Sequence, residues 1–129
     1  MTKQEMGQIY QIRQSIIIQA QKLIALRSCA ECINPKLDGM PRGDNRKDNM
    51  ADIIDKIIKI ENIISRQRRL LNRLILQAET QIRSISDKDV RRIFRLRYIG
   101  CLSWQEIADA LGDGYTQNSV RKIIYRTQI

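Results

Sequence analysis

A row of apolar residues at seven-residue intervals constrains the fold of this chain more than any other feature. The row is unbroken along the middle of the sequence: Met50, Ile57, Ile64, Leu71 and Ala78. A second row lies three residues further on: Ile53, Ile60, Gln67, Leu74 and Gln81. A seven-residue repeat held over several turns requires a helix that packs along a partner in a left-handed, coiled-coil seam. The pattern predicts a helix from about Asp48 to Arg83, roughly 50 Å long at about 1.5 Å per residue.

The beginning of the chain predicts a second long helix of similar length. Thr2 and Glu5 have the spacing of a capping box, and Ile9, Ile16 and Leu23 repeat every seven residues over 3–32. Residues 33–47 contain both prolines, so we expect a loop there. The simplest arrangement is an antiparallel hairpin over 1–83 that leaves apolar side chains half exposed, which predicts a homo-oligomer. The polar seam residues either set the register or are merely tolerated: Gln19, Gln67 and Gln81.

Three shorter helices are predicted in a second domain, residues 84–129. Residues 86–89, S-D-K-D, form a variant of the capping box that opens the first helix, and Gly100 supplies its C-terminal stop. Ser103 and Glu106 form a capping box for the second helix, and Gly112 ends it. The third helix spans about 117–126 and turns these residues inward: Val120, Ile123 and Ile124. With two prolines, six glycines and little alternation at a period of two, the whole chain is expected to be all-α.

The charge balance favours a polyanionic partner. The net charge is +9, and residues 83–129 hold nine Lys and Arg against five Asp and Glu. No signal peptide or membrane span is visible, so we expect a soluble, intracellular protein. The chain has no histidine, no glycine-rich phosphate loop and no nucleophile motif. We therefore expect neither an enzyme nor a cofactor, and identify no catalytic residues.

Three cysteines, an odd number, argue against a disulfide scaffold. Cys29 and Cys32 form a C-x-x-C pair, but a zinc ion needs four ligands and only Cys101 could add another. The two thiols are interpreted as ordinary helix residues and no metal site is expected. A zinc ion shared between protomers is the alternative.

Residues 96–121 contain a motif with a helix-turn-helix pattern. It consists of L-R-Y at 96–98, S-W-Q-E-I-A at 103–108, L-G at 111–112 and S-V-R at 119–121. This segment resembles region 4 of sigma-70 factors. With the loop sequence P-K-L-D-G-M-P-R-G at 35–43, nearly the whole chain resembles small phage and prophage regulators of this type, the ArpU-type late-gene regulators. The turn from Asp113 to Ser119 is longer than in region 4.

This resemblance implies a sigma region 4-like helix-turn-helix after the hairpin. It also implies a transcriptional regulator, by family an activator of late phage genes, which binds double-stranded DNA in the cytoplasm of a bacterial host. Bacterial RNA polymerase is a further implied partner. Two alternatives stay open: an interaction module that binds RNA polymerase with little affinity for DNA, and a DNA-packaging protein like a small terminase subunit.

The third predicted helix carries the candidate base contacts. Arg can bridge two acceptors of guanine, and Asn or Gln can bridge adenine in the major groove. The predicted base contacts are Gln117, Asn118, Ser119, Arg121 and Lys122. The predicted contacts to the DNA backbone are Arg91, Arg92, Arg95, Tyr125 and Arg126. The alternative for both sets is an ordinary solvated helix face. Arg97 is expected to pack within the domain, and Trp104 is interpreted as a core anchor rather than a base-stacking residue.

Overall fold

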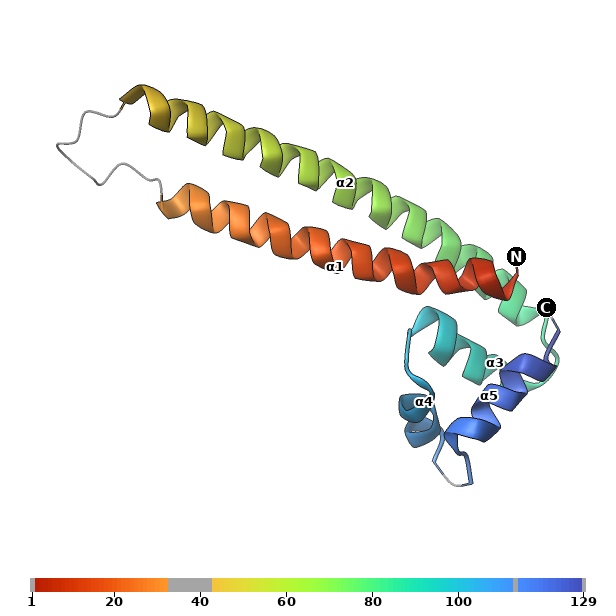
Figure 1. Cartoon of the computed structure of the whole chain (residues 1–129). Coiled ribbons are helices and arrows are strands. Elements are labelled where there is room, and N and C mark those ends of the chain that lie inside the picture. Colours follow the sequence, from red (N-terminus) through yellow and green to blue (C-terminus); the bar gives the residue numbers. More distant parts are fainter. Residues whose placement is uncertain (1, 33–42, 113, 129) are drawn as a thin grey trace. The chain divides into compact units, whose positions relative to one another are not determined.

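The structure, a computed structural model, describes residues 2–32, 43–112 and 114–128 (Figure 1). Every regular element within these ranges is a helix, which confirms the all-α class. The elements are α1 (Lys3–Cys32), α2 (Gly43–Arg83), α3 (Lys88–Phe94), the π-helical turn η1 (Arg95–Ile99), α4 (Trp104–Leu111) and α5 (Gln117–Arg126). No helix among the described residues has both the length and the apolar character that a membrane span requires.

The chain divides into two compact units, and their boundaries differ from the single domain boundary expected near residue 83. Unit 1 consists of Met1–Arg13 and Leu70–Ile129, and unit 2 consists of Gln14–Arg69. Unit 1 therefore combines α3, α4 and α5 with the first part of α1 and the last part of α2. The physical reason is that three short helices expose an apolar face of their own, which these two segments cover.

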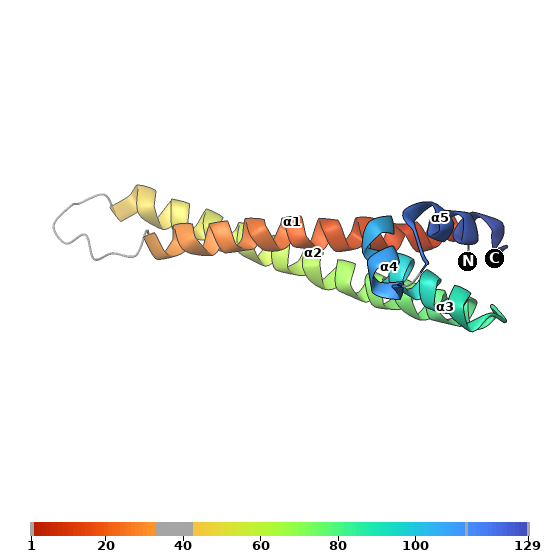
Figure 2. The same ribbon diagram turned by 90° about the horizontal axis from the view of Figure 1, so that it is seen from below.

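In unit 2, α1 and α2 lie side by side in both views (Figures 1 and 2). The apolar rows of the repeat face inward, with Ile64 buried and Ile57 and Ile60 partly buried. Gln67 Nε2 donates a hydrogen bond to Ser15 Oγ at 2.6 Å across the seam. A one-residue slip of either helix would break this bond, so Gln67 favours one register.

Helix α2 begins at Gly43, whereas the sequence pattern predicts a start near Asp48. Once a helix has nucleated, each added residue gains a backbone hydrogen bond, so residues of weak propensity such as Gly43 do not stop its extension. The rest of the predicted loop, 33–42, and with it most of the loop motif, lies outside the described residues.

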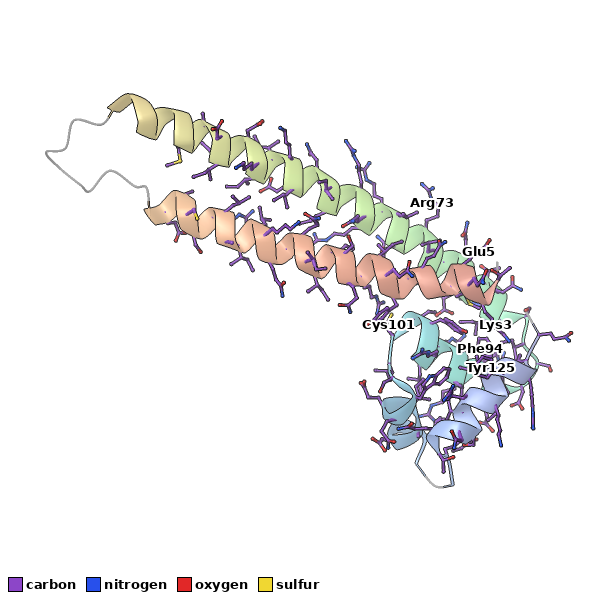
Figure 3. All side chains as sticks on the ribbon, viewed as in Figure 1. Lys3, Glu5, Arg73, Phe94, Cys101 and Tyr125 are labelled. Atoms are coloured by element: carbon purple, nitrogen blue, oxygen red, sulfur yellow. The ribbon has the colours of Figure 1, made fainter. Side chains whose placement is uncertain are left out.

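The core of unit 1 joins residues from five helices. Phe94, labelled in Figure 3, is fully buried in this core. Around it pack the buried side chains of Met6, Ile9, Leu74, Ala78, Ile82, Ile93, Ile107, Ala108, Val120 and Ile124. Burying such side chains stabilises a fold by about 1.5–3 kcal/mol each, so this cluster holds α5 against the rest of the unit.

The start of α3 differs from the expected pattern, whereas the predicted stop at Gly100 is present. The cap of α3 is Asp87, whose carboxylate accepts from the backbone N–H of Asp89, instead of Ser86. A carboxylate at the N-terminus also interacts favourably with the helix dipole. Gly100 follows the last helical residue but has right-handed geometry, and the left-handed residue is Cys101, at φ 56°. Gly100 is needed instead for space, since a Cβ there would lie 2.9 Å from the carbonyl oxygen of Leu96.

The ends of α4 follow the sequence pattern. Ser103 Oγ accepts from the backbone N–H of Glu106, and the Glu106 carboxylate accepts from the N–H of Ser103. Gly112 ends the helix with φ 77°, a conformation that glycine adopts without steric cost. Capping at both ends fixes where α4 begins and stops, and therefore where the chain turns towards α5.

Candidate nucleic-acid interface

Helix α5 presents a polar face to solvent while its apolar face is held in the core. Val120 and Ile124 are buried against the unit 1 cluster, and Ile123 is partly buried. The exposed residues of the helix are Gln117, Asn118, Arg121, Lys122, Tyr125 and Arg126. Both predicted sets of α5 contacts other than Ser119 thus lie on one exposed surface, which we call the α5 face.

The α5 face is rich in side chains with unused hydrogen-bonding groups. Within the described part of the chain, Asn118, Lys122 and Arg126 make no side-chain hydrogen bond or ion pair. Tyr125 is 68% exposed and adds an aromatic ring to this surface. Three cations on this helix, with no acidic residue in it, make the surface suitable for a polyanion.

Ser119 has a structural role that the sequence did not indicate. Its hydroxyl accepts from the N–H of Thr116 at 2.8 Å and donates to the Thr116 carbonyl at 2.9 Å. Thr116 in turn accepts from the N–H of Ser119, which completes a capping box. The Ser119 hydroxyl is therefore engaged in fixing the start of α5, and we leave it out of the base-contact set.

Trp104 connects α4 to two arginines. The guanidinium of Arg97 lies 4.0 Å from the centre of the indole ring, and that of Arg121 lies 6.0 Å from it. Arg97 also donates to the carbonyl of Leu102 at 2.9 Å, so it packs within unit 1 as predicted. Trp104 is partly buried against the core, in agreement with its interpretation as an anchor. The ring thus lies between an internal arginine and one on the α5 face.

The predicted backbone arginines of α3 and η1 lie in different surroundings. Arg92 is exposed and Arg91 is partly buried. Arg95 forms an ion pair with Glu79 of α2, with Nε 3.4 Å from the carboxylate oxygen. Part of the charge of Arg95 is thereby neutralised within unit 1, which makes Arg92 the clearest candidate of the three for a phosphate contact.

Two residues near α5 were missed by sequence reasoning. Lys3 Nζ donates to the carbonyl of Ile124 at 2.6 Å and lies 3.5 Å from that of Tyr125, so it caps the last turn of α5 (Figure 3). Gln105, in the first turn of α4, accepts from the side chain of Gln117 at 2.6 Å. No local pattern signals either contact, because the partners lie on different helices.

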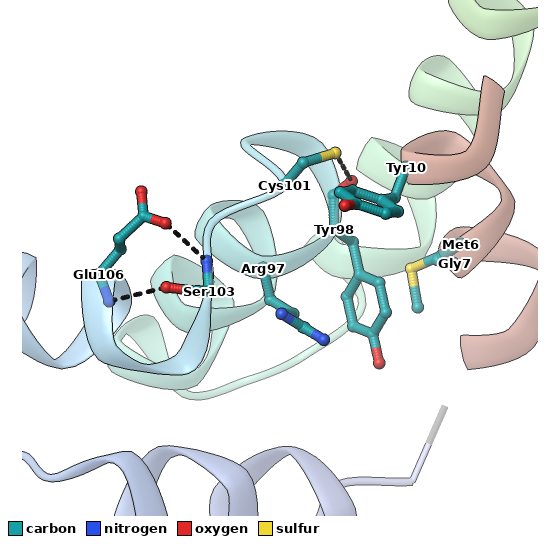
Figure 4. A pocket seen from close by; sticks show the side chains of 8 residues that line it. All are labelled: Met6, Gly7, Tyr10, Arg97, Tyr98, Cys101, Ser103 and Glu106. Carbon is teal, nitrogen blue, oxygen red and sulfur yellow. Dashed lines mark hydrogen bonds between the residues drawn. The ribbon is translucent and has the colours of Figure 1, made fainter. Parts of the chain in front are cut away.

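A pocket of about 440 Å³ lies elsewhere in unit 1 (Figure 4). Its lining consists of Met6, Gly7, Tyr10, Arg97, Tyr98, Cys101, Ser103 and Glu106. Burial raises the pKa of the Tyr98 hydroxyl, an effect that the positive charge of Arg97 partly opposes. The tyrosine hydroxyl therefore stays neutral at physiological pH.

The described residues gather no group of three potential metal ligands from His, Cys, Asp and Glu. The side chain of Cys32, half of the predicted C-x-x-C pair, lies outside the described set, whereas Cys29 is exposed and free.

Comparisons with models of protein families, with curated proteins and with solved structures find no match for this chain.

Proposed function

We propose that this protein is a DNA-binding transcriptional regulator that reads the major groove with α5. In this proposal α3, α4 and α5 form a sigma region 4-like helix-turn-helix, and the long parts of α1 and α2 form an antiparallel hairpin. The motif at 96–121 supports the sigma-like helix-turn-helix, and the loop sequence at 35–43 supports a late-gene regulator of phage or prophage type, acting in the cytoplasm of a bacterial host. The function needs no catalytic group and no cofactor.

The observation that carries the proposal is the division of α5 into two faces. Its apolar side is anchored in the core, while Asn118, Arg121 and Lys122 extend donors and acceptors into solvent. Such groups suit base edges, and N-terminal residues of a recognition helix reach them. Arg92 and Arg126 supply charge for phosphates, which positions the protein without reading sequence.

Selection of duplexes from a random pool, followed by binding isotherms at several salt concentrations, tests the proposal. We expect an enriched sequence and a steep fall of affinity with salt. If no duplex is enriched and only RNA polymerase is retained, the interaction-module alternative replaces it. If the purified protein forms closed rings on DNA without sequence preference, the packaging alternative does.

A pair of arginine substitutions separates base reading from general affinity. Arg121→Ala should cost about 1–3 kcal/mol on the selected site and relax discrimination at one base pair. Arg92→Ala should weaken all sequences similarly and reduce the salt slope by about one. Because Arg121 also lies near Trp104, thermal melting of both variants must show an unchanged fold. An unchanged ratio of specific to non-specific affinity in Arg121→Ala contradicts its base-reading role.

We further propose that unit 2 binds a second copy of this chain. The seam row is used within the unit, so a second copy would meet outward isoleucines: Ile17, Ile24, Ile54 and Ile58, each 48–64% exposed. Arg27 and Glu61 pair at 2.9 Å beside them and neutralise each other. Asp55 and Lys59, beside Ile54 and Ile58, form a second ion pair at 3.1 Å. The charges next to these isoleucines are therefore matched on an otherwise basic chain, so two copies can meet there with little repulsion. Two copies would also present two recognition helices to adjacent half-sites.

Sedimentation equilibrium with matched variants tests this self-association. Ile24→Lys with Ile58→Lys should convert a dimer or higher species to monomer. Ile18→Lys with Ile63→Lys adds the same charge at exposed isoleucines that point in other directions, and should leave the mass unchanged. A monomeric wild type at tens of micromolar, roughly where a weak association would be detected, contradicts the proposal. Equal effects of the two pairs would place the interface elsewhere.

A further inference from the structure

A directional chain of side-chain hydrogen bonds leads from α4 to the first residue of α5. Gln117 Nε2 donates to Gln105 Oε1 at 2.6 Å, and Gln105 Nε2 donates to Asp109 Oδ1 at 2.8 Å. All three side chains are exposed. Gln117 is the first residue of α5, at the end where a recognition helix approaches bases. This series of hydrogen bonds therefore ends on a residue of the α5 face.

The carboxylate of Asp109 fixes the donor and acceptor direction of both hydrogen bonds. Asp109 can only accept, so the amide nitrogen of Gln105 must face it and the amide oxygen must face Gln117. That oxygen accepts from the nitrogen of Gln117. Among the described residues, no further partner takes the second N–H or the amide oxygen of Gln117, and the bond to Gln105 sets the orientation of the amide.

One free donor beside one free acceptor matches the edge of a single base. Adenine presents the acceptor N7 beside the donor N6–H in the major groove, whereas guanine presents two acceptors there. An amide oxygen placed against guanine O6 would be repelled. We infer that Gln117 reads an adenine, and that Gln105 and Asp109 are positioning residues for this specificity. The inference rests on the proposed function and adds the base that is read and two residues outside α5.

Binding to the selected duplex and to copies altered at single adenines tests the inference. Replacing the adenine read by Gln117 with 7-deaza-adenine removes N7 alone. Wild-type affinity should fall about 5- to 150-fold at one A·T position when the base pair is changed, and by part of that with 7-deaza-adenine. Gln117→Ala should lose this discrimination. Gln105→Ala should reduce it by about 2- to 12-fold, the share of one net hydrogen bond, and leave binding to random duplex unchanged.

Two further variants distinguish positioning from a general loss of structure. Asp109→Asn keeps the size of the side chain but can donate as well as accept, so it removes the fixed direction and should also reduce discrimination at the same base pair. Gln11→Ala, an exposed glutamine of unit 1 on α1, is the control and should change nothing. The double variant of Gln105 and Gln117 should discriminate no worse than Gln117→Ala alone, because the two residues act as one unit.

The outcomes separate this inference from the proposed function. If the wild type selects no duplex, the proposed function fails and the inference fails with it. If it selects a sequence but Gln105→Ala and Asp109→Asn keep full discrimination at every position, only the inference is overturned. A selected sequence in which Gln117→Ala relaxes a G·C pair instead also overturns it.

Discussion

Substitution of Gly100 by alanine should destabilise unit 1, against the usual effect of this change. Replacing glycine by alanine at a right-handed position ordinarily stabilises a protein by about 0.4–1 kcal/mol, because alanine loses less backbone entropy on folding. Gly100 has such a backbone, with φ −75°. The expected sign is therefore set by the surroundings of the added methyl group rather than by its conformation.

The surroundings of Gly100 leave no room for that group. The added Cβ would lie 2.9 Å from the carbonyl oxygen of Leu96 and 3.6 Å from its carbonyl carbon and Cα. These are backbone atoms of the π-helical turn, which cannot rotate away as the end of a side chain can. Overpacking of this kind costs about 1–3 kcal/mol. Setting the entropic gain against this cost leaves a net destabilisation of up to about 2.5 kcal/mol.

Gly7 provides the matched control. It lies inside α1, in the part that belongs to unit 1, and a Cβ there would meet nothing within 4 Å. Gly7→Ala should therefore stabilise the unit by about 0.5–1 kcal/mol. Urea unfolding followed by the fluorescence of Trp104, the single tryptophan, reports on unit 1. Equal shifts of the two variants in the same direction would refute the steric argument.

Three other outcomes are expected. Ile57→Asp with Ile64→Asp should lower the helical circular dichroism of unit 2 and its melting temperature, because these seam side chains face inward, and retention of wild-type helicity would contradict their burial. Lys3→Met should lower the melting temperature through the loss of a cation at the C-terminal end of α5, worth about 0.5–2 kcal/mol, and an unchanged melt would show that this contact contributes nothing. Metal analysis of protein purified without chelator should find no stoichiometric zinc, and one zinc ion per protomer or per dimer would contradict this expectation.

The elements that follow a local pattern could be predicted from the sequence. The seven-residue row predicted the inward side of α2, where Ile64 and Ala78 are buried. The spacing of Ser103 and Glu106 predicted the cap of α4, because both partners lie within one turn. The inward positions of α5 could be predicted because apolar residues recur there at helical spacing.

Features that depend on distant partners, or on local geometry outside the common motifs, could not be predicted. The sequence predicted a stop at Gly100, but not that the residue with left-handed geometry would be Cys101. Ser119, a predicted base contact, instead bonds Thr116 in a capping box whose fourth residue is serine rather than the usual Glu or Gln. Contacts such as Gln105 to Gln117 require the relative placement of two helices, which no spacing in one helix encodes.

The bond from Lys3 to α5 has a consequence for how the protein is made. Its two partners are separated by 121 residues, whereas the bonds inside unit 2 join residues 34 and 52 apart. On the ribosome, unit 2 can therefore fold before α5, which unit 1 needs, has been synthesised. Until α5 emerges, the core that buries Met6 and Ile9 is incomplete, so we expect these apolar side chains to stay exposed in the nascent chain. Ribosome stalling placed just before α5 should thus yield a chain with a protease-resistant unit 2 and a protease-sensitive first turn of α1.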